Sequence, residues 1–225
     1  MRVSMIAGAA VLTGLGVRVV RSRHRRFLHP DGRTFAGEMT TVDGDRYSAT
    51  VRVSKGAGTG PGRADVLGLA VRVHRREPAD LLLSTAGTGR FTRYVPMPRR
   101  SFDTVYGSIL PYRTASGRKV HLLAEPDPDG PPLGDSLESV SAAAAAGTGL
   151  LLSALGGTVI ARVAFGSALP DEVDAALAFD PIRNAPAELH PAGAIHHSRA
   201  LAYRLSQRWR QARPTQPAPE RVTTT

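Results

Sequence analysis

Short segments that alternate apolar and polar residues recur along this chain of 225 residues, between clusters of glycine, proline and aspartate. The clearest is residues 47–54, Tyr-Ser-Ala-Thr-Val-Arg-Val-Ser, and residues 66–73 follow as a second candidate after a glycine-rich loop. Alternation with a period of two is typical of strands that bury one face. The 23 glycines and 17 prolines are spread over the chain, which favours many turns over a helical bundle.

The same pattern predicts a mainly β protein of the α+β class. Further strands are expected at residues 34–41, 80–85, 119–125, 150–155, 158–165 and 174–179. Gly156 and Gly157 join two of these as a two-residue hairpin would. Residues 86–113 are expected to be mostly loop, and Ser198 is a suitable N-cap for a helix over 199–212. Six to eight strands indicate a closed antiparallel barrel or a sandwich with helices at its ends.

The length suits one domain, which we place at residues 26–213. Residues 1–25 are apolar and then basic, but the apolar run is shorter than the roughly 20 residues of a spanning helix. We expect a helix packed on the domain, and a weak anchor with peripheral membrane contact is the alternative. The location expected is cytoplasmic or membrane-associated. Residues 214–225 are rich in proline, threonine and glutamine and are expected to be a disordered tail.

Composition limits the chemistry available to the chain. It has no cysteine, which excludes disulfides, thiolate metal sites and a cysteine nucleophile, so a metal must be held by His, Asp, Glu or Tyr. The net charge of +10 comes almost entirely from arginine, and an arginine-rich coding bias would explain it as well as an anionic partner would. Without interleaved aromatics or a known module, no specific nucleic-acid binding is predicted.

Arg199 and Tyr203 lie four residues apart on the predicted C-terminal helix and therefore share one face. A tyrosine has a pKa near 10, and an adjacent guanidinium and an Fe(III) centre both favour its anion. The tyrosinate could then be the axial ligand of a haem iron. Arg210 lies two helical turns further on the same face and could meet a haem propionate. Taken alone, such a pair is a weak signal that packing in a core explains better.

Other motifs indicate less. The glycine loop at residues 56–62 lacks the Lys-Ser/Thr ending of a phosphate-binding loop and is expected to be flexible. The histidines near the C-terminus fit no zinc spacing, and no Gly-x-Ser-x-Gly stretch indicates a serine hydrolase.

The order of several motifs resembles the catalase family. Arg26 stands three residues before His29, as an arginine precedes the distal histidine in catalases. Arg52-Val-Ser54 resembles the family's Arg-x-Ser strand. Next come an aspartate at Asp65 and the strand Gly68-Leu-Ala-Val-Arg72, which resembles the family's Gly-φ-Ala-Val-Lys/Arg strand, where φ is apolar.

The resemblance continues to the C-terminal helix. An Asp-Leu strand starts at Asp80, and Phe179-Asp-Pro181 resembles the Phe-x-Pro stretch that leads to the Arg-x-x-x-Tyr helix, here Arg199 and Tyr203. The motifs agree in order and spacing over residues 26–210.

This resemblance implies a catalase-like closed barrel that binds one haem b. Tyr203 would be the iron ligand, with Arg199 tuning its charge. His29 would act as general base and then acid towards a peroxide, with Ser54 orienting its imidazole. The residues expected at the propionates are Arg26, Arg52 and Arg210.

Two departures from the family limit the expected activity. Thr85 stands where the family's catalytic asparagine is expected, and the chain is far shorter than a full catalase. Small catalase-related proteins use hydrogen peroxide or fatty-acid hydroperoxides, so a haem peroxidase acting on peroxide or lipid hydroperoxide is expected. One alternative is a barrel that only binds haem or a lipid-like ligand; a poorer one is a basic nucleic-acid-binding domain. A homodimer remains open.

Overall fold

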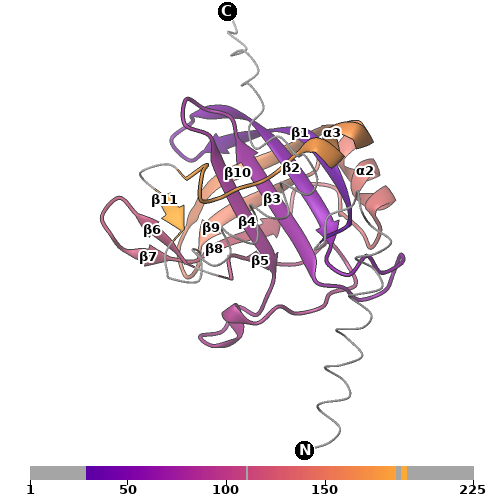
Figure 1. The fold of residues 1–225 in the computed structure, drawn as a ribbon, viewed down its shortest axis with the longest axis horizontal. Helices are drawn as coiled ribbons and strands as arrows, with labels where there is room; N and C mark the ends of the chain where they lie inside the picture. Colours follow the sequence, from indigo (N-terminus) through magenta and orange to yellow (C-terminus); the bar gives the residue numbers. More distant parts are fainter. Residues whose placement is uncertain (1–28, 110, 186–188, 192–225) are drawn as a thin grey trace, which may run out of the picture.

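Eight antiparallel strands close into a barrel in the order β1-β10-β9-β8-β5-β4-β3-β2 (Figure 1). The structure is a computed structural model and describes residues 29–109, 111–185 and 189–191. The barrel strands are β1 Asp31–Thr41, β2 Arg46–Lys55, β3 Leu67–Val73, β4 Ala79–Thr85, β5 Tyr106–Gly107, β8 Leu122–Pro126, β9 Gly149–Ala154 and β10 Val159–Ala168. The closed antiparallel barrel expected from the sequence is confirmed.

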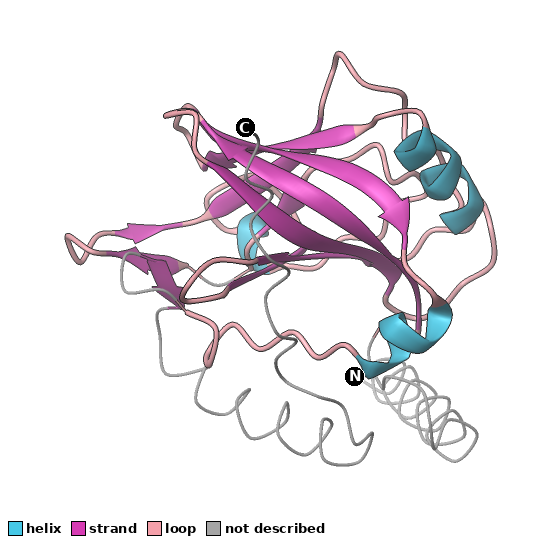
Figure 2. Cartoon of the chain, turned by 90° about the horizontal axis from the view of Figure 1, so that it is seen from above, coloured by secondary structure: helices cyan, strands magenta, loops and turns pink. Residues whose placement is uncertain are grey.

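Small elements decorate the two ends of the barrel. One end carries helices α2 (Leu137–Ala145) and α3 (Asp171–Ala176), and the other carries a hairpin of β6 (Tyr112–Thr114) and β7 (Lys119–Val120) (Figures 1 and 2). Strand β11 (Leu189–Pro191) pairs with β6. None of the helices within the described ranges is long and apolar enough to cross a membrane. The helices expected at the two ends of the chain lie outside those ranges.

The barrel core is aliphatic, with one aromatic pair. Phe35 of β1 stacks on Phe165 of β10 with ring centroids 5.4 Å apart. Val51 and Val53 of β2 point inward and are fully buried. Thr50, Arg52 and Ser54, which alternate with them on β2, are also buried, although they face outward. The outer face of this strand is therefore covered, and its polar side chains need partners there.

Two strand predictions differ from the structure in detail. The hairpin of β9 and β10 is present, but its turn covers residues 155–158, with Gly156 at φ +75° and Gly157 N–H donating to Ala154 O at 2.8 Å. The strand expected at residues 119–125 is divided at His121 into β7 and β8. The division arises because the chain changes partner there, from β6 to the barrel strands β5 and β9.

The prediction of a strand at residues 174–179 is wrong, because residues 171–176 form the helix α3. Pro170 precedes the helix, and three carboxylates lie in its first turn, where the helix dipole favours negative charge. The alanine patch at residues 142–146 falls almost wholly in α2, which begins with a capping box between Ser136 and Ser139. These local end signals decide both helices.

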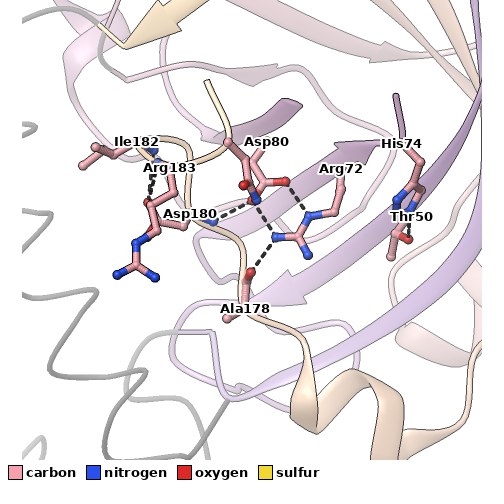
Figure 3. A network of polar contacts seen from close by, with 9 residues as sticks. Thr50, Arg72, His74, Asp80, Ala178, Asp180, Ile182 and Arg183 are labelled. Carbon is pink, nitrogen blue, oxygen red and sulfur yellow. Dashed lines mark hydrogen bonds and ion pairs between the residues drawn. The ribbon is translucent and has the colours of Figure 1, made fainter. Parts of the chain in front are cut away.

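After α3, residues 177–184 cross the outer face of the barrel; we call this segment the strap. A buried ion pair holds it (Figure 3). Arg72 of β3 donates twice to Asp80 of β4, with both distances at 2.7 Å, and donates to Ala178 O at 2.6 Å. Asp80 also accepts hydrogen bonds from Asp180 N–H at 2.6 Å and from the Asn184 side chain at 2.9 Å. The pair therefore joins two strands to the strap.

His74 lies beside this network. Its Nε2 is 2.7 Å from the hydroxyl oxygen of Thr50 (Figure 3). Burial lowers the pKa of His74 below its ordinary value, and the charge of Arg72 lowers it further against the opposing effect of Asp80. The folded protein therefore favours the neutral imidazole.

Asp80→Asn should lower the free energy of unfolding by about 3–5 kcal/mol, because it leaves the Arg72 guanidinium charged and buried without its counterion. Denaturant titration measures the change. Glu38→Gln, which breaks the exposed pair of Glu38 with Arg46, is the matched control and should cost less than about 1 kcal/mol. Equal losses in both variants would show that burial of the first pair does not matter.

His74→Gln should reduce the acid sensitivity of the fold. Because the pKa of His74 is lower in the folded than in the unfolded protein, the unfolded chain binds the proton more readily, and stability falls as the pH drops below about 6.5. Denaturant titrations at pH 8 and pH 5.5 test this. Glutamine can keep a hydrogen bond to Thr50, so the variant should match the parent at pH 8 and lose less at pH 5.5. An unchanged pH dependence would contradict the assignment.

Candidate functional site

The strand register places a row of small residues across the outer face of strands β1 to β4. Gly32 pairs with Ser54, Ser54 with Gly68, and Gly68 with Ser84. Cross-strand partners project from the same side of a sheet, so this row faces away from the aliphatic core. The row therefore leaves the sheet surface without large side chains.

His29 lies over this row, immediately before β1. Its Nδ1 is 3.0 Å from Ser54 Oγ, and its N–H donates to Gly56 O at 3.2 Å. A Cβ at Gly68 would lie 2.6 Å from His29 Nδ1 and Cε1, so only glycine admits the imidazole there. His29 also has φ +57°, a left-handed conformation that costs a non-glycine residue about 1 kcal/mol or more. The contact between His29 and Ser54 implied by the resemblance is present.

The hydrogen bonds of Ser54 favour one form of the imidazole. Ser54 Oγ lies 3.4 Å from Gly68 O, which can only accept a proton. When Ser54 donates to that carbonyl, it accepts from Nδ1–H of His29. Nε2 is then the basic nitrogen of the ring, as a proton acceptor requires.

Arg52 lies next to this pair, but its guanidinium is bound to a carboxylate of the chain. Its Nε donates to Asp174 of α3 at 2.7 Å, and the Arg52 side chain is only 5% exposed. The Thr34 hydroxyl also donates to Asp174. Gly32 permits this arrangement, since a Cβ there would lie 2.5 Å from Arg52 Nη2. The expected propionate partner is thus already paired within the protein.

Asp174 is the residue of this site that the sequence reasoning missed. The error arose because residues 174–179 were expected to be a strand, whereas α3 presents Asp174 to Arg52. Pro170 followed by acidic residues is a helix-start signal that could have corrected it.

Thr85 does not approach His29. It lies on the same face of β4 as Leu81 and Leu83 of the core, and its hydroxyl accepts from Leu67 N–H at 3.0 Å and donates to Met97 O at 2.6 Å. The β4 residue on the face of His29 is Ser84, which pairs with Gly68 in the ladder and donates to Leu67 O at 3.1 Å. The structure brings Ser84 to the row, one position before the residue expected.

The glycine loop after β2 is organised around Asp65. The Asp65 carboxylate accepts from Ala57 N–H and from Thr59 N–H, both at 2.9 Å. Burial raises the pKa of Asp65, but these hydrogen bonds outweigh it and leave the pKa below its ordinary value. An internal carboxylate therefore already accepts hydrogen bonds from two backbone N–H groups of this loop.

The remaining candidate residues lie outside the described ranges: Arg26, Arg199, Tyr203 and Arg210. Within residues 29–109, 111–185 and 189–191, histidine and carboxylate side chains do not gather in threes around a point that could hold a metal ion. The described part of the site is thus the His29 imidazole over a row of small residues, as the distal side of a haem site would require, and it includes no iron ligand.

Comparison with known proteins supports the fold. No family model matches the chain, and no curated protein matches its sequence. Among solved structures, a fungal catalase determined at 1.9 Å is similar, with a TM-score of 0.59 and 14% sequence identity. The match covers 86% of this chain but 61% of the catalase chain, so the protein spans less than two thirds of that structure. The chain has a catalase-like barrel fold.

Proposed function

We propose that this chain binds a haem b on the outer face of β1 to β4 and reduces hydrogen peroxide or an organic hydroperoxide there. The observation that carries the proposal is His29, held by Ser54 at 3.0 Å against a glycine of β3 that admits no side chain. A strained backbone at His29 supports a role for its imidazole beyond packing. The resemblance in motif order and the catalase-like barrel support haem as the cofactor.

Each residue has a defined task in this proposal. Tyr203, with Arg199 beside it, would ligate the iron as tyrosinate. His29 would take a proton from the peroxide at Nε2 and return it to the leaving oxygen. Ser54 would keep the ring in the form that has Nε2 unprotonated. A bound haem would supply the two electrons that reduce the peroxide and would recover them from a second peroxide or an organic donor.

The propionate-binding residues form a separate group. Arg26 and Arg210 would contact the propionates, and Arg52 would do so by exchanging its bond to Asp174 for one to a propionate. The carboxylate of Asp174 therefore occupies, in the described protein, the position where a ligand carboxylate would bind.

A second candidate is a barrel that binds haem or a lipid-like ligand without efficient turnover. Thr85 favours it, because both hydrogen bonds of its hydroxyl go to the backbone and it lies on the core side of β4. Ser84, which does lie beside Gly68, donates to Leu67 O. Neither side chain replaces the amide that would polarise a peroxide opposite the histidine.

Purified full-length protein supplied with haem should show the visible spectrum of a high-spin ferric haem with a tyrosinate ligand. Tyr203→Phe should abolish that spectrum, because a phenyl ring cannot ligate iron, whereas Tyr94→Phe in an exposed loop should leave it unchanged. His29→Ala should retain the haem and lose peroxide turnover by about 10²- to 10⁴-fold. His74→Gln is the matched histidine control.

Three outcomes separate the two candidates. Failure of the parent protein to take up haem would overturn the peroxidase and haem binding by the second candidate, and would leave only the binding of a lipid-like ligand. Haem uptake with no turnover above that of free haem would favour the binder, and so would turnover that is insensitive to His29→Ala.

Asp174→Asn should destabilise the haem-free protein and tighten haem binding. The variant leaves the buried Arg52 without its carboxylate, which should cost about 3–5 kcal/mol in the absence of haem. A propionate then meets no competing carboxylate at Arg52, so the Kd for haem should fall. A fall of roughly tenfold corresponds to about 1.4 kcal/mol of binding free energy. Denaturant titration with and without haem, and haem titration, measure both effects.

The matched control for Asp174→Asn is Asp171→Asn. Asp171 lies on the same helix as Asp174, but its side chain is 82% exposed and pairs with Arg33 of β1. Its loss should therefore change neither the stability nor the Kd for haem appreciably. If Asp174→Asn binds haem no more tightly than this control, Arg52 does not contact the propionates.

A further inference from the structure

The loop between β4 and β5 presents apolar side chains to solvent on a hydrogen-bonded turn. Residues 87–100 extend from the barrel, with the one-turn helix η1 (Thr92–Tyr94) at the far end (Figure 1). Gly87 N–H donates to Thr92 O, and Val95 N–H donates to the same carbonyl, at 3.1 and 2.9 Å. The Tyr94 ring meets the His121 ring edge-on at 5.3 Å. These contacts fix the loop, so its exposed side chains are held outward.

Three large apolar residues of this loop are exposed. Phe91 is 77% exposed, Tyr94 49% and Val95 51%. A phenylalanine that is mostly in water loses about 1.5–3 kcal/mol relative to a buried one. Apolar side chains that gather at an exposed position usually mark a surface for binding.

Four arginines lie in the same loop as these side chains. Arg90, Arg93, Arg99 and Arg100 lie in the loop, and the sequence has no Asp or Glu from residue 81 to residue 102. Within the described ranges none of the four pairs with a carboxylate. Arg90 lies over the Phe91 ring, 5.6 Å from its centroid, and Arg93 donates to Gly89 O. The loop therefore combines exposed apolar groups with unneutralised positive charge.

A second exposed apolar patch provides a contrast. Val42, Val159 and Ile160 are 66%, 41% and 39% exposed, and Val42 N–H donates to Ile160 O at 3.1 Å. Asp43 and Asp45 lie next to it in the sequence. This patch has apolar exposure and nearby negative charge, so it would not favour an anionic partner.

We propose that residues 87–100 dock on an anionic lipid bilayer, with Phe91, Tyr94 and Val95 in the interface and the arginines at the lipid phosphates. Aromatic and aliphatic side chains next to basic ones are the chemistry of interfacial membrane anchors. Each arginine near an anionic surface contributes roughly fivefold in affinity. A loop end offers less than the ~1,000 Å² that a specific protein interface needs, whereas a bilayer requires no shape complementarity. The proposal does not depend on haem binding.

The absence of cysteine allows a local test in the full-length protein. We would replace Phe91 by cysteine, attach an environment-sensitive fluorophore, and add vesicles of phosphatidylcholine with 30% phosphatidylserine. The 91 label should shift to shorter wavelength with these vesicles and not with pure phosphatidylcholine. Val42→Cys, labelled in the same way, is the control and should not respond. A local label separates this loop from any membrane contact of residues 1–25.

Charge removal completes the test. Arg90→Gln with Arg93→Gln, in the 91-labelled protein, should weaken the response to anionic vesicles by about tenfold or more, and 0.5 M salt should weaken it too. The proposal is overturned if the 91 label stays silent while the protein sediments with vesicles. An equal response at position 42, or to pure phosphatidylcholine, also overturns it. So does a shift produced by raising the protein concentration alone, which indicates a second copy, or by polyglutamate but not vesicles, which indicates an acidic protein.

Discussion

The buried ion pair between Arg72 and Asp80 connects the parts of this molecule that the sequence leaves far apart. The two residues are direct neighbours in the ladder of β3 and β4, so the pair stabilises the register of those strands. Asp80 then binds the strap 100 and 104 positions later in the chain. The Phe179 ring lies against the guanidinium, with Arg72 Cζ 5.2 Å from the ring centroid. A charge buried this deeply is tolerated because its counterion and several hydrogen bonds compensate it together, although Arg72 Nη1 has no hydrogen-bond partner among the described residues.

The same physical rule organises the rest of the outer face. Strand β2 is buried on both sides, so its outward polar residues must find partners in whatever covers them. Arg52 and Thr34 find Asp174, and the N–H groups of the glycine loop find Asp65. Within the described residues, both of these positions, at Arg52 and in the glycine loop, thus hold a carboxylate of the chain itself. A ligand carboxylate would bind by exchange with one of these, which makes Asp174 the side chain that sets the cost of binding at Arg52.

Much of the fold could be predicted because strand periodicity and turn residues are local signals. The strands expected from 34–41 to 158–165 are present to within a few residues, apart from the division at His121, while the short strands β5 and β6 lie where mostly loop was expected. The division could not be predicted because a change of strand partner does not alter the periodicity of the sequence. Helix α3 was not predicted because a segment of six residues is too short to show the helical period, and the role of Asp174 was therefore not predicted either.

The candidate site shows the same limit. The proximity of His29 and Ser54 could be expected from the resemblance, and the structure places them in contact. The sequence could not tell which residue of β4 faces the histidine, because a shift of one residue moves a side chain to the other face of a strand. Thr85 therefore lies on the core side and Ser84 on the face of the imidazole.

The sequence by itself determined the class of fold, the strand order in the chain, the absence of thiol chemistry and the residue types available for a site. Those properties follow from local pattern and composition. Only the tertiary structure decided that Arg52 is neutralised by Asp174, that Gly68 makes room for an imidazole, and that Arg72 and Asp80 hold the strap. These contacts depend on the register between strands and on which segment covers which face, and the closing of the barrel determines both.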